Sequence, residues 1–176
     1  TFSALKAAAL HHLDFQLDLL EQGFTLSDAT AYNVQFVGSR PVFIDHLSFR
    51  PYRAGEFWAA HQQFCEQFLN PLLLRSQLGI PHNAWFRGSL EGIPSEYLAR
   101  ILPHRSRLSF RMNVHVFLPA HFQKGTQRDA LGQATSPRAK GLSRSGLEGL
   151  LKQLQRWIAS LKPADTNPRR RRGGGH

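Results

Sequence analysis

This 176-residue chain has one cysteine and no long apolar run, and each scarcity excludes a class of protein. A single cysteine, Cys65, excludes an internal disulfide and fits a reducing compartment, so we expect a cytoplasmic protein. No stretch reaches the roughly eighteen uninterrupted apolar residues that a membrane span needs, so we expect no membrane partner. The start, Thr1-Phe-Ser-Ala-Leu-Lys6, lacks the layout of a signal peptide and does not begin with Met. We therefore expect a piece of a longer chain.

Acidic residues are also few, and the net charge of +10 is unevenly distributed. Residues 1–137 hold 12 Lys and Arg against 10 Asp and Glu, whereas residues 138–176 hold 10 against 2. The basic character therefore belongs to the C-terminal part, mainly to the run Arg169–Arg172. A terminal Arg run can bind phosphate backbones, but this one has no interleaved aromatic residues, which favours a solvated, disordered tail. We do not expect nucleic acid as a partner, and an adaptor of that kind is the third alternative.

Apolar periodicity predicts a mainly helical chain with one short β-hairpin, an α+β fold. Residues 3–22 are predicted to form a helix with Ser3 as N-cap and Gly23 in the left-handed conformation after its end. Two short β-type runs, Val34–Phe36 and Val42–Ile44, are joined by a Gly-containing turn, which predicts a hairpin. Further helices are predicted over residues 56–74, 94–102 and 146–161.

These elements predict four parts. Residues 1–124 form a helical lobe with the hairpin, and 125–144 form a polar linker. Residues 145–162 form an amphipathic helix, and 163–176 form a disordered basic tail. Within the lobe, residues 106–122 carry both helical and β-type patterns, and both alternatives stay open.

Three polar residues next to the hairpin are the strongest functional signal. Asp28 and Asn33 are five residues apart in one loop, and Asp45 follows the second strand of the hairpin. Kinase-fold phosphotransferases place a proton-accepting Asp, a metal-binding Asn and a second metal-binding Asp in this order. The pattern predicts a catalytic role for Asp28 and Mg²⁺ binding by Asn33 and Asp45, with ATP as the phosphoryl donor.

Each of the three residues has a structural alternative. Asp28 can close an Asx turn, Asn33 can fill a turn, and Asp45 can cap the segment after the strand. The sequence also departs from the kinase pattern, because Leu26 replaces the usual His two positions before Asp28 and no Gly follows Asp45. No Gly-rich phosphate loop or strand Lys precedes the first helix, so we expect this chain alone to be inactive and to bind ATP poorly.

Two longer stretches carry a resemblance to a known family. Residues 23–36, Gly-Phe-Thr-Leu-Ser-Asp-Ala-Thr-Ala-Tyr-Asn-Val-Gln-Phe, and residues 40–49, Arg-Pro-Val-Phe-Ile-Asp-His-Leu-Ser-Phe, are similar to bacterial proteins identified as class I S-adenosylmethionine-dependent methyltransferases. Further similar stretches are residues 58–69, 91–94 and 102–108, so the resemblance covers roughly residues 2–162.

The resemblance implies a transferase with two parts. This region would be its N-terminal, kinase-like part, which resembles the helical C-lobe of a protein-kinase-like or aminoglycoside-phosphotransferase-like fold. The implied partner is a downstream methyltransferase domain of the same parent chain, which would bind S-adenosylmethionine, and the acceptor is an unknown small molecule or glycan. The sequence lacks the Gly-rich strand-to-helix turn of a methyl-donor site, so that site is not expected in this chain.

Two functional alternatives follow for the kinase-like part. It can be a working metal-dependent phosphotransferase lobe within the parent protein, or a non-catalytic scaffold that binds substrate or partner. Histidines suggest no third chemistry: His11 and His12 are adjacent on a helix, and His115 and His121 have no acidic partner nearby in sequence. We therefore expect no zinc site, and we interpret Cys65 as a small core residue.

Overall fold

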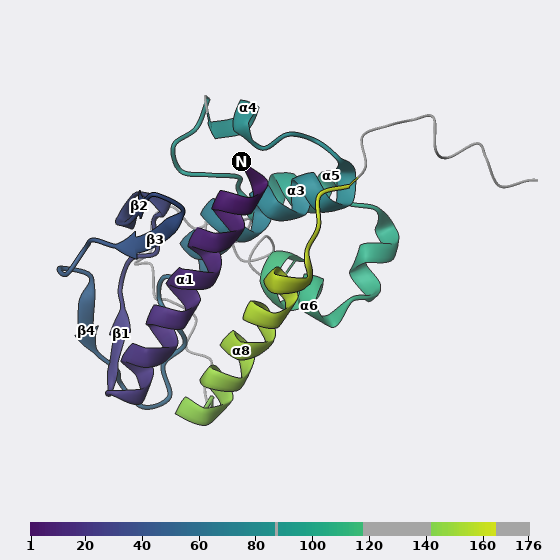
Figure 1. The fold of residues 1–176 in the computed structure, drawn as a ribbon. Helices are drawn as coiled ribbons and strands as arrows, with labels where there is room; N and C mark the ends of the chain where they lie inside the picture. Colours follow the sequence, from purple (N-terminus) through teal and green to yellow (C-terminus); the bar gives the residue numbers. More distant parts are fainter. Residues whose placement is uncertain (87, 118–141, 165–176) are drawn as a thin grey trace, which may run out of the picture.

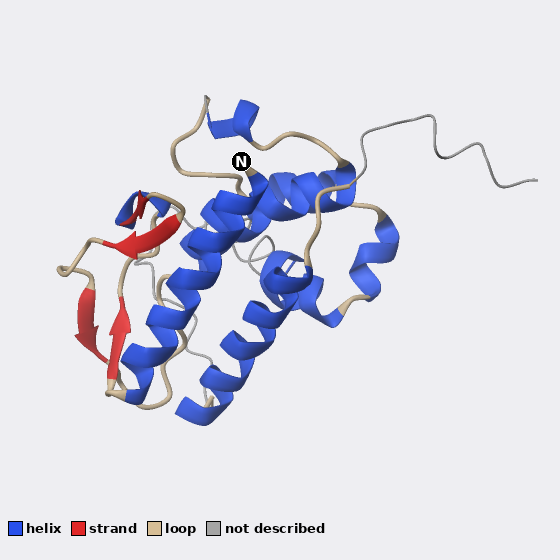
Figure 2. Cartoon of the chain, in the orientation of Figure 1, coloured by secondary structure: helices blue, strands red, loops and turns tan. Residues whose placement is uncertain are grey.

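The computed structural model describes residues 1–86, 88–117 and 142–164 and is mainly helical, with two small antiparallel sheets (Figures 1 and 2). An α+β fold is therefore confirmed. The predicted tail from residue 165 onward, and the predicted linker up to residue 141, lie outside the described residues. None of the helices in the described part of the chain combines the length and apolarity that crossing a membrane requires.

The α-helices are α1 (Phe2–Glu21), α2 (His61–Phe64), α3 (Asn70–Leu78), α4 (Asn83–Phe86), α5 (Ser95–Ile101), α6 (Phe110–Met112) and α8 (Arg144–Ser160). The strands are β1 (Phe24–Leu26), β2 (Val34–Val37), β3 (Arg40–Phe43) and β4 (Phe49–Pro51). Short 3₁₀ turns form η1 (Ala31–Asn33) and η3 (His104–Leu108), and π-helical turns form η2 (Cys65–Leu69) and η4 (Asn113–Phe117).

The first helix begins earlier than predicted. Its N-cap is Thr1, whose hydroxyl accepts from the Ala4 N–H at 3.2 Å, and the expected cap Ser3 lies inside the helix. An N-cap side-chain oxygen accepts from the N–H two or three residues further on, and Thr1 stands at that spacing from Ala4. The predicted glycine stop is confirmed: Gly23 has a φ of 82° and leads the chain directly into β1.

The predicted hairpin is confirmed as the β2–β3 pair, with Val34 opposite Phe43 and Val37 opposite Arg40. A second pair was not predicted: β1 runs antiparallel to β4, with Leu26 opposite Phe49. Two strands of three residues each give too little alternation to be recognised in a sequence. The β1–β4 pair bears on the predicted site because the loop that contains Asp28 follows β1, and Asp45 precedes β4.

The helix predicted over residues 56–74 begins later, at His61, and runs through α2, η2 and α3 to Leu78. Glu56 is outside it because its carboxylate accepts hydrogen bonds from Arg50 Nη1 at 2.8 Å and from the Arg53 N–H at 2.9 Å. Pro71 is accommodated next to the π-helical turn η2, in the first turn of α3. The segment 110–117 is helical, so the β interpretation of Val114–Phe117 is wrong.

The core lies between α1, α8 and the continuous helix formed by α2, η2 and α3, which we call the central helix. In Figure 1, α1 and α8 run side by side. Fully buried side chains come from all three elements: Leu13 and Leu20 of α1, Phe64, Phe68 and Leu72 of the central helix, and Leu147, Leu151, Leu154 and Ile158 of α8. The predicted C-terminal amphipathic helix is confirmed, with Ser143 as its N-cap.

Candidate functional site

The loop between β1 and β2, which bears Asp28 and Asn33, is attached to the central helix by two glutamine side chains. Gln63 Oε1 accepts from the Ala29 N–H at 2.8 Å, and Gln67 Oε1 accepts from the Ala31 N–H at 2.8 Å. Gln67 is buried, so its amide is held in place. These two hydrogen bonds fix the loop backbone on the helix. The local sequence pattern of the helix or of the loop does not predict this attachment.

The structure brings Asn33 and Asp45 together. Asn33 Nδ2 donates to Asp45 Oδ2 at 3.2 Å, and the Asn33 carbonyl accepts from the Ile44 N–H at 2.9 Å. Asp45 also accepts from the Leu47 N–H at 2.9 Å and from the Ser48 hydroxyl. Asn33 is buried and Asp45 is half-buried, at the boundary between core and solvent. A loop residue and a hairpin-end residue, 12 positions apart, thus form one polar centre.

Hydrogen bonds keep the Asp45 carboxylate ionised. The Ser48 hydroxyl and then the Leu47 N–H lower its pKa below the usual value, and His46 and Asn33 add smaller effects in the same direction. The hydrogen bonds from Ser48, Leu47 and Asn33 favour the charged form of the carboxylate, His46 acts through its charge, and burial has a smaller opposing effect. At neutral pH Asp45 therefore presents a negative charge, which suits a cation ligand.

Asp28 is half-buried in the same loop and accepts from the Thr30 N–H at 2.9 Å through Oδ1. This is the Asx turn that the sequence offered as the structural alternative. Of the three predicted residues, Asn33 and Asp45 are in direct contact. Asp28 instead makes its hydrogen bond within its own loop.

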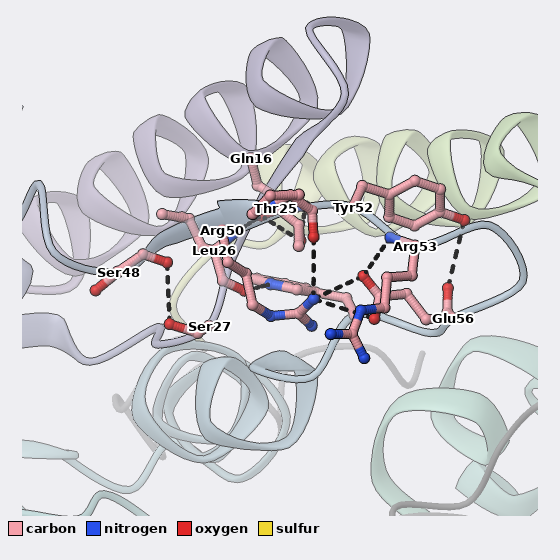
Figure 3. A network of polar contacts seen from close by, with 11 residues as sticks. Gln16, Thr25, Leu26, Ser27, Ser48, Arg50, Tyr52, Arg53 and Glu56 are labelled. Carbon is pink, nitrogen blue, oxygen red and sulfur yellow. Dashed lines mark hydrogen bonds and ion pairs between the residues drawn. The ribbon is translucent and has the colours of Figure 1, made fainter.

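A polar network around β1 positions Ser48 and therefore Asp45 (Figure 3). The Ser48 carbonyl accepts from both the N–H and the hydroxyl of Ser27, at 2.8 and 3.0 Å. Gln16 of α1 binds the strand itself, because its Oε1 accepts from the Leu26 N–H at 2.8 Å and its Nε2 donates to the Thr25 hydroxyl at 2.9 Å. The loop after β3 is thereby fixed to β1 and to α1.

The same network continues along β4. Arg50 forms an ion pair with Glu56, with both carboxylate oxygens within 3.1 Å of Nη1. The Tyr52 hydroxyl reaches the Glu56 carbonyl at 3.5 Å. Figure 3 shows these side chains lying along one edge of the β1–β4 pair. They hold the segment that follows Asp45.

The structure assembles a second group of ligand-type side chains that sequence reasoning missed. His61 Nε2 lies 2.9 Å from His115 Nδ1 and 3.7 Å from Cys65 Sγ, and all three residues are buried. Burial lowers the pKa of His61 to about 3 and that of His115 to about 4, and it raises the pKa of the Cys65 thiol. The His61–Cys65 spacing of four was a usable signal, but His115 joins from a distant helix. His121 lies outside the described residues.

Comparison with known proteins gives one informative similarity. No family model matches the chain, and no solved structure matches it. The chain is 52% identical over 162 residues to the nodulation protein NoeA of Rhizobium meliloti (strain 1021). That match covers 92% of this chain but 34% of NoeA, so the chain spans about a third of the length of this curated relative.

Proposed function

We propose that this chain is the acceptor-side lobe of a larger bacterial transferase, with a Mg²⁺-dependent phosphoryl-transfer centre at Asp28, Asn33 and Asp45. The supporting observation is the 3.2 Å contact between Asn33 Nδ2 and Asp45 Oδ2, which joins the β1–β2 loop to the end of the hairpin. Kinase-type phosphotransferases hold their metal with an Asn of the catalytic loop and an Asp that follows the next hairpin. In this proposal Asp28 accepts the proton of the attacking hydroxyl group.

The two ligand residues fit Mg²⁺ in donor chemistry. A carboxylate can accept four contacts, and three on Asp45 are made by Leu47, Ser48 and Asn33. Rotation of the Asn33 amide would present its oxygen instead of its N–H₂ group, and that exchange leaves Asp45 two positions for a cation. Mg²⁺ commonly has one or two protein ligands and takes the rest from water and phosphate.

Side chains around the centre leave it open to a substrate. Tyr32 is 57% exposed, Ile44 is 44% exposed and Leu47 is 95% exposed, although all three are large and apolar. Exposed apolar groups beside the Asn33–Asp45 pair suit a surface that another part of the protein, or an acceptor, covers. ATP would need further contacts from such a covering part.

For the whole protein we propose methyl transfer from S-adenosylmethionine. This rests on the family resemblance of residues 23–36 and 40–49. The match to NoeA leaves about two thirds of that relative unmatched, and a methyl-donor domain would belong to the corresponding part of this protein. Because that relative is named for nodulation, we propose that the acceptor is a small molecule or glycan used in that process.

A second candidate function is a scaffold without catalysis. It is favoured by the fact that Asp45 and Asp28 both accept backbone N–H groups two residues further on, from Leu47 and Thr30. Those contacts alone would make both residues turn-forming. In that case the lobe binds an acceptor or the methyltransferase part, and metal plays no role.

The two candidates are separated by a Mg²⁺-dependent ATP-binding titration of the full-length protein. We expect Asp45→Asn, which keeps the shape of the side chain, to weaken Mg²⁺-dependent binding at least about tenfold, equivalent to about 1.4 kcal/mol. Asp18→Ala removes an exposed carboxylate of α1 and serves as the matched control, with unchanged binding. Unchanged affinity in a folded Asp45→Asn protein, or no Mg²⁺-dependent binding by the wild type, would reject the phosphotransferase centre and support the scaffold.

A further inference from the structure

Three buried side chains meet in the core at distances close to those of metal ligands. His61 and Cys65 lie one turn apart on the central helix, and His115 comes from η4. His61 Nε2 is 2.9 Å from His115 Nδ1 and 3.7 Å from Cys65 Sγ. One ligand atom from each residue can be chosen so that all three lie within 4.8 Å of one another.

We propose that His61, Cys65 and His115 bind one thiophilic d¹⁰ metal ion, Zn²⁺ or Cu⁺. Imidazole and thiolate are the ligands that both ions prefer. Metal–nitrogen bonds of about 2.0–2.1 Å and a metal–sulfur bond of about 2.3 Å in a tetrahedron separate ligand atoms by about 3.3–3.6 Å. The His61–His115 N–N distance would need to open, and the His61–Cys65 N–S distance to close, by a few tenths of an ångström. The separation of Cys65 Sγ from the His115 nitrogen, which lies within 4.8 Å, would need to close by up to about an ångström. As the metal–sulfur bond forms, the thiol proton leaves to the buffer.

The site is isolated from water. The exposed fractions are 4% for His61, 0% for Cys65 and 2% for His115, and the surroundings include Phe57, Trp58 and Trp157. In such a medium an uncompensated charge is costly. A thiolate and two neutral imidazoles make a neutral complex with Cu⁺ and a complex of charge +1 with Zn²⁺. Charge balance therefore favours Cu⁺.

Ligand number points the same way. Among the residues that the structure describes, no fourth His, Cys, Asp or Glu joins the group. Zn²⁺ in proteins is almost always four-coordinate and would need a water or hydroxide as its fourth ligand. We therefore expect Cu⁺ to bind more tightly than Zn²⁺.

The backbone at two of the three ligands forms π-helical turns, which are uncommon within helices. Cys65 begins the π-helical turn η2, and His115 lies within the π-helical turn η4. Single π-helical turns are rare and frequently occur at functional sites. A neutral hydrogen bond between the two imidazoles accounts for their contact, but it does not require a thiol beside them or two π turns at one place.

The test is metal titration of the full-length apo-protein under reducing, oxygen-free conditions. Cu⁺ is supplied from a bicinchoninate complex and Zn²⁺ from a competing chromophoric chelator, and Co²⁺ serves as a spectroscopic substitute. We expect one equivalent of ion per chain, a rise in melting temperature, and a sulfur-to-cobalt charge-transfer band. Cys65→Ser should weaken binding at least about a hundredfold and abolish that band, and His115→Asn should weaken binding by a similar factor.

Two controls keep the result interpretable. His104→Ala removes an exposed histidine and should leave Cu⁺ binding unchanged. Asp45→Asn should lose Mg²⁺-dependent ATP binding but still bind one equivalent of Cu⁺ at the His61–Cys65–His115 group, so this proposal can fail independently of the phosphotransferase centre. If Cys65→Ser does not fold, the wild type alone still gives an answer, because bound metal should protect Cys65 from alkylation in mild denaturant. The proposal is overturned if neither ion binds at one equivalent and neither protects Cys65, or if folded Cys65→Ser and His115→Asn proteins bind as the wild type does.

Discussion

At the scale of single residues, His12 is the most unusual side chain of the core. It is completely buried on α1, and neither ring nitrogen has a hydrogen-bond partner. Its ring instead contacts Phe43 edge-on at 5.4 Å between centroids, and it also lies within 5.8 Å of Phe64 and Phe68. Burial, with a smaller effect from His11, lowers the pKa of His12 to about 3. The fold therefore keeps this imidazole neutral.

His12→Leu tests the cost of that arrangement. Leu has a similar size and no polar atoms, so we expect it to stabilise the protein at pH 7 by about 1 kcal/mol or more. The pH dependence should also change. In the unfolded chain His12 binds a proton below about pH 6.5, whereas in the folded chain it does so only near pH 3. Above pH 6.5 His12 is neutral in both states and its protonation does not affect stability. As the pH falls from 6.5 towards 3, the unfolded chain gains a proton that the folded chain does not, and stability is lost.

That loss amounts to a slope approaching about 1.4 kcal/mol per pH unit from this one histidine. Urea unfolding between pH 7 and pH 5 measures it, and the slope should be shallower in His12→Leu by about that amount. Equal slopes for wild type and His12→Leu would mean that His12 is protonated in the folded protein.

At the scale of elements, one π-helical turn explains how the chain returns to the central helix. The Asn70 N–H bonds to the Cys65 carbonyl, five residues back, and the Glu66 carbonyl is released from the helix. The Ile93 N–H donates to that carbonyl at 2.8 Å. Gly92, with a φ of 86°, passes so close that a Cβ would lie 2.7 Å from the Glu66 carbonyl carbon and 2.9 Å from Gln67 Cα.

Gly92→Ala should therefore destabilise the protein by about 3 kcal/mol or more. The left-handed conformation alone costs a residue with a Cβ about 1–2 kcal/mol, and a clash with backbone atoms, which cannot rotate away, adds to it. Gly38→Ala is the matched control, because Gly38 has a φ of 64° but open space around it. Chemical denaturation should show a clearly larger loss for Gly92→Ala, and equal losses would contradict the close approach.

Elements with local signals could be predicted from the sequence, and those made by distant contacts could not. The β2–β3 hairpin follows from its own turn residues, and the stop of α1 follows from Gly23. The β1–β4 pair and η2 depend on partners more than twenty residues away, namely Phe49 for Leu26 and Ile93 for Glu66. The start of the central helix was misplaced because Glu56 binds Arg50 instead of entering the helix.

The same distinction holds for the candidate sites at the scale of the whole molecule. Asn33 and Asp45 could be predicted to meet, because a single hairpin separates them. His61 and Cys65 share a helix, but His115 is 54 residues from His61, and only the packing of η4 against the central helix brings it there. Nothing in the spacing of the nine histidines indicates that approach.

The core of the whole molecule is completed by α8. Its residues Leu147, Leu151, Leu154 and Ile158 have no exposed surface, and Trp157 contacts the ring of His115 at 6.1 Å between centroids. Lys6 of α1 adds a polar contact, because its ammonium group donates to the Leu161 carbonyl at 2.9 Å. The helix thus packs on α1 and next to the His61–Cys65–His115 group.

We therefore expect α8 to unfold together with the rest of the described chain. Leu154→Ala should cost about 2–5 kcal/mol, because it leaves a cavity in a fully buried interface, whereas Lys152→Ala on the exposed face should cost less than about 0.5 kcal/mol. Urea unfolding monitored by far-UV circular dichroism and by tryptophan fluorescence should give coincident transitions that shift together in Leu154→Ala. If instead the variant lost α8 in a separate early transition while the remaining helices unfolded at the wild-type midpoint, α8 would be an independently attached element, and its burial of His115 would add nothing to the stability of the core.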